Sequence, residues 1–193
     1  MSIEIEAKLK VESLVEIAMR VSELGGEFQQ KVLQRDCYFD DSAESLLSQD
    51  RCLRLRRQST QGHEKAFLTY KGPKEKTRLK KRQEINVVVE DADSTEKLAE
   101  ALGYEKALSF EKKREIWKLD DCQVCLDELP LLGSYVEIEG PDEEKITRLQ
   151  EKLGLSDLPH IPESYAILTR EELERKGVNR KEILFGGGKS VLE

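Results

Sequence analysis

The segment Glu4-Ile5-Glu6-Ala7-Lys8, close to the start of the chain, decides the fold. In a β-strand, successive side chains point to opposite faces, so Glu4, Glu6 and Lys8 share one face and the aliphatic residues share the other. Carboxylates on alternate residues stand roughly 6.5 Å apart, and their oxygens can hold hard divalent cations. The lysine can then contact an anion held by those cations. The segment fits binding of metal-complexed phosphate, but on its own it is more typical of an edge strand with a solvated charged face.

The same alternation of charged and aliphatic residues recurs in several later segments. The polar positions that face away from aliphatic neighbours are Arg54, Arg56, Thr69, Lys71, Arg82, Glu84, Lys112, Arg114, Asp127, Glu137 and Glu139. One such strand means little, but a set of them predicts a sheet with one dry face and one ionic face. If the sheet closes on itself, the ionic face becomes a polar tunnel lined by acids and bases.

Composition agrees with such a tunnel. The chain has 193 residues, of which 37% are charged and 38% are hydrophobic, whereas an average domain is about a quarter charged. A closed barrel with a charged lumen accounts for both values, and the strong periodicity argues against disorder. The length predicts one domain with a substantial core.

Net charge and the absence of apolar runs limit the classes of partner. The formal net charge of −7 argues against a general nucleic-acid binder, which would need a basic surface. The start of the chain is polar and acidic, unlike a signal peptide, and no apolar run approaches the length of a membrane span. We therefore expect a cytoplasmic protein with no nucleic-acid or membrane partner. The sequence leaves open whether the protein forms a homodimer.

Strand and helix patterns alternate along the chain. Strands are predicted at residues 2–10, 28–40, 51–58, 65–71, 79–90, 105–120, 122–129 and 134–140. Helices are predicted from a Ser13 cap to Gly25, from a cap at Asp93 to Gly103, from Pro141 in the first turn to Gly154, and over 163–176. Residues 1–176 are expected to form the domain, and residues 177–193, with three consecutive glycines, are expected to be a flexible tail.

In their order along the chain, these residues resemble the CYTH superfamily, the triphosphate tunnel metalloenzymes. The resemblance covers roughly residues 1–170 and rests on Glu4-x-Glu6-x-Lys8, Tyr70-Lys71-Gly72-Pro73, Leu126-Asp127 and Glu137. The string at 68–73 is most similar to the class IV adenylyl cyclase branch. The resemblance implies an α+β fold, an eight-stranded antiparallel β-barrel that closes around a tunnel, with peripheral helices.

The resemblance also implies roles for individual residues. Those implied to bind Mg²⁺ or Mn²⁺ are Glu4, Glu6 and Glu137, assisted by Asp127 and Glu139. Those implied to bind the triphosphate are Lys8, Arg54, Arg56, Lys71, Arg82, Lys112 and Arg114, with Glu84 as a further tunnel acid. Those implied to take part in catalysis are Glu6, Lys8, Arg56 and Lys71. Phosphoryl transfer is mainly positioning and charge stabilisation, so acids for metal and bases for phosphate fit it. The alternative is a set of cross-strand salt bridges with no ligand.

Three functions share this set of residues. A class IV-type adenylyl cyclase converts ATP to cyclic AMP and pyrophosphate. A triphosphatase hydrolyses tripolyphosphate, thiamine triphosphate or a nucleoside triphosphate. A non-enzymatic module binds triphosphate or polyphosphate as a sensor. The string at 68–73 favours the cyclase.

Overall fold

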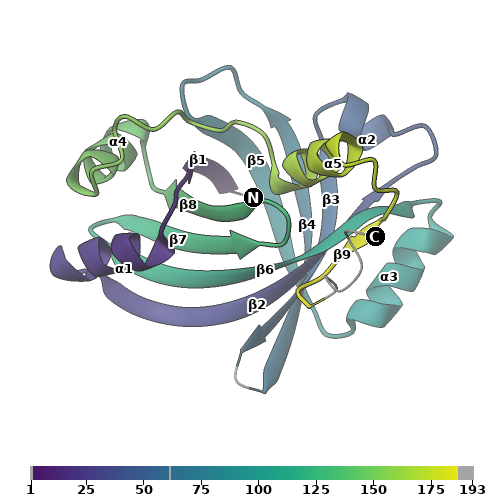
Figure 1. Cartoon of the computed structure of the whole chain (residues 1–193). Helices are drawn as coiled ribbons and strands as arrows, with labels where there is room; N and C mark the ends of the chain where they lie inside the picture. The colour runs from purple at the N-terminus through teal and green to yellow at the C-terminus, as the bar shows by residue number, and fades with distance from the viewer. Residues whose placement is uncertain (1, 61, 187–193) are drawn as a thin grey trace.

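The strands with alternating charge close into a barrel (Figure 1). The computed structural model describes residues 2–60 and 62–186. The barrel strands are β1 (Ser2–Lys10), β2 (Glu27–Asp40), β3 (Cys52–Thr60), β4 (His63–Lys74), β5 (Lys80–Val89), β6 (Glu105–Leu119), β7 (Cys122–Leu129) and β8 (Gly133–Glu139). They follow the order β2-β3-β4-β5-β1-β8-β7-β6, and β6 pairs back with β2. Every one of these pairings is antiparallel, which confirms the predicted barrel.

Five helices lie outside the barrel in the described part of the chain (Figure 1). They are α1 (Leu14–Glu23), α2 (Ser45–Ser48), α3 (Ala92–Ala101), α4 (Glu143–Lys152) and α5 (Tyr165–Arg175). Helices α1 and α4 pack on the β7–β8 side, and α3 packs on β3 and β4. Helices α2 and α5 meet at one end of the barrel, where Arg170 pairs with Glu44 at 3.0 Å. That end of the lumen is therefore covered by helices.

The dry faces of the strands point outward, under the helices. Leu9 of β1 and Val136 and Ile138 of β8 are fully buried and pack with Val21 of α1 and Ile146 of α4. Because side chains alternate across each strand, burial of these aliphatic residues directs their charged neighbours into the lumen. The position of the core thus explains why the inside of the barrel is ionic.

Two helices begin at residues other than those predicted. The cap at Ser13 is confirmed, since its side chain accepts a hydrogen bond from the Glu16 amide. Helix α3 is capped by Asp91 instead of Asp93, because the Asp91 carboxylate already accepts from the amides of residues 93 and 94. Asp142 caps α4, so Pro141 precedes the cap and does not lie in the first turn. The short helix α2 was not predicted.

The chain also stays packed on the barrel beyond residue 176, where a flexible tail was expected. Strand β9 (Glu182–Ile183) pairs in parallel with β6 at Ser109 and Phe110. Ile183 is buried among apolar residues, and the amide of Phe185 donates to the Glu111 carboxylate. The expectation is therefore wrong for this stretch, and its remainder, 187–193, lies outside the described residues.

None of the helices within residues 2–60 and 62–186 combines the length and the hydrophobicity that crossing a bilayer requires.

Candidate functional site

The lumen of the barrel is a cavity of about 640 Å³, a size in the usual range of ligand sites. All eight barrel strands contribute side chains to its wall, together with α2 and α5. Every site residue predicted from the sequence lines the cavity except Asp127. The structure thus brings side chains from distant parts of the sequence around one space, and their functional roles stay predictions.

One side of the lumen holds four carboxylates with two lysines. Lys71 donates to both oxygens of Glu4, at 2.8 and 2.6 Å, and lies 2.7 Å from Glu84. Lys80 pairs with Glu6, and Glu6 lies opposite Glu139 in the β1–β8 register. Burial, and then the charges of Glu4 and Glu6, raise the pKa of Glu139 to about 7. This acidic side therefore carries repulsion between carboxylates that its lysines do not fully relieve.

The donor chemistry of the acidic side fits a hard divalent cation. Carboxylate oxygens are the ligands that Mg²⁺ and Mn²⁺ prefer, and a cation would relieve the repulsion at Glu139. Within residues 2–60 and 62–186, no three such side chains converge at metal-binding distances, because Glu4 and Glu6 contact lysines instead. Glu4, Glu6 and Glu139 are the residues that would hold the cation once those lysines move to an anion.

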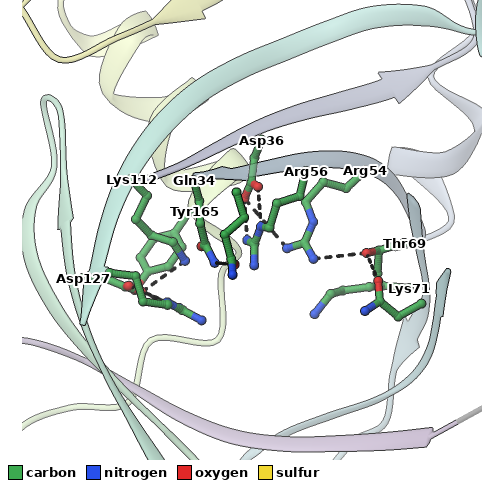
Figure 2. A network of polar contacts seen from close by, with 12 residues as sticks. Gln34, Asp36, Arg54, Arg56, Thr69, Lys71, Lys112, Asp127 and Tyr165 are labelled. Carbon is green, nitrogen blue, oxygen red and sulfur yellow. Dashed lines mark hydrogen bonds and ion pairs between the residues drawn. The ribbon is translucent and has the colours of Figure 1, made fainter. Parts of the chain in front are cut away.

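The opposite side of the lumen presents guanidinium groups (Figure 2). Arg56 makes a two-pronged ion pair with Asp36, at 2.6 and 2.7 Å. Arg54 lies 3.8 Å from the same carboxylate and donates to Thr69 at 3.3 Å. Burial alone would raise the pKa of Asp36, but Arg56 and Arg54 reverse this and hold it well below its usual range. The Nε of Arg54 is buried and has no hydrogen-bond partner in the described part of the chain. A lumenal guanidinium with an unused donor suits an anion.

A third group surrounds Asp127, which is 0% exposed. Arg114 donates to its two oxygens at 2.7 and 2.5 Å, Lys112 at 3.2 Å, and the Tyr165 hydroxyl at 2.8 Å (Figure 2). Glu137 pairs with Arg114 and, at 3.4 Å, with Lys8. Both carboxylates were predicted to bind metal, but the structure surrounds them with cations. This arrangement favours holding the bases in position as their role.

Arg82 differs from the other predicted phosphate-binding bases. Its side chain donates to the backbone carbonyls of Gly72 and Asp50, at 2.7 and 2.9 Å. These contacts tie β5 to the irregular stretch of β4 near Gly72 and to the segment before β3, so many of the Arg82 donors are already used in contacts that hold the fold.

Sequence reasoning missed Asp36 and Tyr165. Asp36 had a signal, because Gln34, Asp36 and Tyr38 continue the period-two pattern of polar side chains in β2 and all line the lumen. No sequence pattern pointed to Tyr165, because its position depends on how the segment before α5 crosses the end of the barrel.

Comparisons with known proteins agree with this geometry. The model of the CYTH domain family matches residues 2–165. A Methanocaldococcus jannaschii protein named "Putative adenylate cyclase" is 29% identical over 182 residues, which cover 94% of this chain and 97% of the relative.

Solved structures match over a similar extent. A Pyrococcus horikoshii protein is 31% identical with a TM-score of 0.77, over 88% of this chain and 99% of that one. A Hippeastrum protein, described as a "putative adenylyl cyclase" with a dominant triphosphatase activity, has a TM-score of 0.69 over 87% of this chain and 95% of its own. At 17% identity, the second likeness shows the fold alone.

Proposed function

The chain belongs to the CYTH domain family, and from this we propose that it is a metal-dependent enzyme that binds a triphosphate in its lumen and cyclises ATP to cyclic AMP and pyrophosphate. The observation that carries the proposal is the division of one cavity into an acidic side and a basic side. Glu4, Glu6, Glu84 and Glu139 lie on the first, and Arg54, Arg56, Lys112 and Arg114 lie on the second. The acidic side would hold a divalent cation, and the basic side would bind the phosphate oxygens of its triphosphate.

The charges of the lumen explain why a ligand is expected. Buried ion pairs stabilise a fold weakly, because desolvation offsets much of their attraction. A barrel that needed only stability would fill its interior with apolar residues. A phosphate oxygen would offer Arg54 an acceptor that its side chain lacks in the described residues, and a metal cation would relieve the repulsion at Glu139. These two features support a ligand over a set of purely structural salt bridges.

The chain's own residues would act mainly by positioning and by neutralising charge. Arg54 and Arg56 are two residues apart in β3 and therefore share the lumenal face. Their planar guanidinium groups would bind phosphate oxygens. Lys8, Lys112 and Arg114 would balance the charge that develops on the leaving pyrophosphate. A divalent cation, when bound by Glu4, Glu6 and Glu139, would supply Lewis-acid stabilisation of the phosphate oxygens.

Two observations favour cyclisation, and one favours hydrolysis. The string Leu68–Pro73 is similar to the class IV cyclase branch, and the Methanocaldococcus jannaschii relative carries a cyclase name. The Hippeastrum protein shares the fold and is described as mainly a triphosphatase. Hydrolysis of a triphosphate is therefore the second candidate function.

Product analysis separates these functions. We expect ATP incubated with the protein and Mg²⁺ or Mn²⁺ to give cyclic AMP and pyrophosphate in equal amounts, as measured by chromatography. Orthophosphate without cyclic AMP, with faster turnover of tripolyphosphate, would overturn the cyclase proposal and leave the triphosphate enzyme intact. Tight binding with no turnover of any triphosphate would favour the sensor.

Arg54 offers a test of the basic side of the lumen. Arg54→Lys keeps the charge but loses the planar donors, so we expect the Kd for tripolyphosphate to rise on the order of tenfold. Titration calorimetry with Mg²⁺ present measures this change. The matched control is Arg57→Lys. Arg57 lies on the same strand, but its side chain is on the outer face of the barrel and pairs with Asp93 at 2.7 Å. Equal affinities of the two variants would remove Arg54 from the phosphate-binding set.

A further inference from the structure

Tyr165, the first residue of α5, contacts two lysines of the lumen. The Lys8 ammonium lies 4.0 Å from the centroid of the Tyr165 ring, and the Lys112 ammonium lies 4.8 Å from the same centroid. The Tyr165 hydroxyl donates to Asp127 at 2.8 Å. Figure 2 shows the ring beside Lys112, with Asp127 close to both. One aromatic side chain thus contacts two cations and the carboxylate that also binds one of them.

The ring is held firmly in this place. Tyr165 is 6% exposed and follows Ser164, whose side chain caps α5 by accepting from the Ile167 amide. Tyr135 packs edge-on against it, with ring centroids 5.3 Å apart. The Lys8 ammonium also donates to the Glu163 carbonyl at 2.8 Å. The segment that carries Tyr165 is therefore bound to the same lysine that its ring contacts.

The two lysines have weak anionic partners. Lys8 and Lys112 are each 2% exposed, yet their closest carboxylate contacts in the described chain are 3.4 Å to Glu137 and 3.2 Å to Asp127. A desolvated ammonium over an aromatic face gains stabilisation without losing its charge. Burial lowers the pKa of both lysines, that of Lys112 to about 8, and the ring opposes this loss of charge while the N–H groups can still serve another anion.

The hydroxyl of Tyr165 acts on Asp127. It donates to Oδ2, the oxygen that Lys112 contacts, and Arg114 donates to both oxygens at shorter distances. With these donors in place, Lys112 makes the longest of the contacts to Asp127. A carboxylate that lost the hydroxyl would draw Lys112 closer and away from the lumen.

We propose that Tyr165 is a positioning residue that presents Lys8 and Lys112 together as one phosphate-binding pair, its ring facing both ammoniums and its hydroxyl limiting the pull of Asp127 on Lys112. This inference rests on the proposed function, because the anion for the pair is a phosphate group of the substrate. It adds α5 to the elements that shape the basic side of the lumen.

Two variants separate the ring from the hydroxyl. Tyr165→Leu removes both and is expected to weaken binding of a non-hydrolysable imido analogue of tripolyphosphate by roughly thirtyfold. Tyr165→Phe keeps the ring and is expected to weaken it by about fivefold. The control is Tyr135→Phe, which removes the hydroxyl of the adjacent ring, is not among the residues that line the cavity, and should leave affinity unchanged. Calorimetry with Mg²⁺ gives Kd, and thermal unfolding checks the fold.

A double-mutant cycle tests whether Tyr165 acts through the lysines. In a Lys8→Met, Lys112→Met background, Tyr165→Leu should have no further effect on Kd, whereas a merely structural role predicts the same loss in both backgrounds. Wild-type protein that does not bind the analogue would overturn the proposed function itself. Two outcomes would overturn this inference alone, provided that the wild-type protein binds the analogue. One is that the losses of affinity from Tyr165→Leu and from the lysine substitutions add, and the other is that the Kd of Tyr165→Leu is within twofold of the wild-type Kd. If Tyr165→Leu does not fold, equal affinities of Tyr165→Phe and Tyr135→Phe overturn it.

Discussion

Replacing Glu4 and Glu6 together with glutamine is expected to lower triphosphate turnover by roughly two orders of magnitude or more. Glutamine keeps the shape of each side chain but removes the charge that would hold a divalent cation. Stability should change little, because two effects oppose each other. Lys71 and Lys80 lose charged partners, but Glu139 is relieved of the repulsion that adds to burial in raising its pKa to about 7.

The control removes two carboxylates from the outer face of the same barrel. Glu115 pairs with Lys31, and Glu128 pairs with Lys113, on positions that point away from the lumen. Glu115→Gln with Glu128→Gln should keep wild-type turnover, since exposed pairs of this kind contribute little. Turnover is measured over a range of Mg²⁺ concentrations. Near wild-type rates in the Glu4 and Glu6 variant, or an equal loss in the control, would remove the metal role from β1.

The set of side chains that share the lumenal face could be predicted because strand periodicity is local, whereas the closed eight-stranded barrel was implied by the family resemblance. Glu4, Glu6 and Lys8 share a face whatever they pair with, and the outward aliphatic set requires cover by helices. The same rule extends to Asp36, which sits between Gln34 and Tyr38 on the lumenal face of β2. Its pattern was present in the sequence although its role was not assigned.

Partnerships between charges could not be predicted, because they depend on how distant strands align. Asp127 lies opposite Arg114 only because β6 and β7 pair in that register, and the Tyr165 hydroxyl reaches the same carboxylate from α5. Charge alone could not distinguish a metal ligand from the partner of an arginine. The cytoplasmic location, the lack of a nucleic-acid partner and a homodimer stay predictions.

Asp127→Asn is expected to lower the free energy of unfolding by ~3–5 kcal/mol, the usual cost of leaving buried charges without their partner. Arg114 and Lys112 both face Asp127, which is 0% exposed. Urea denaturation measures the loss. Adding Lys112→Met to Asp127→Asn should recover part of the stability, because it removes one of the uncompensated cations. Tripolyphosphate binding should weaken as well, since Arg114 loses the carboxylate that orients it.

A comparison of Asp127→Asn with Glu139→Gln decides whether a lumenal carboxylate binds metal or holds the basic side chains in position. A metal ligand repels other acids in the metal-free protein, so its loss should leave the metal-free protein as stable as wild type and remove the stabilisation that Mg²⁺ and tripolyphosphate give together. We expect that result for Glu139→Gln, because burial and then the acidic neighbours Glu4 and Glu6 raise the pKa of Glu139. Asp127→Asn should instead destabilise the metal-free protein and keep a stabilisation by Mg²⁺. If Asp127→Asn behaved as Glu139→Gln does, Asp127 would be a metal ligand, and its contacts with Arg114, Lys112 and Tyr165 would have to open when the metal binds.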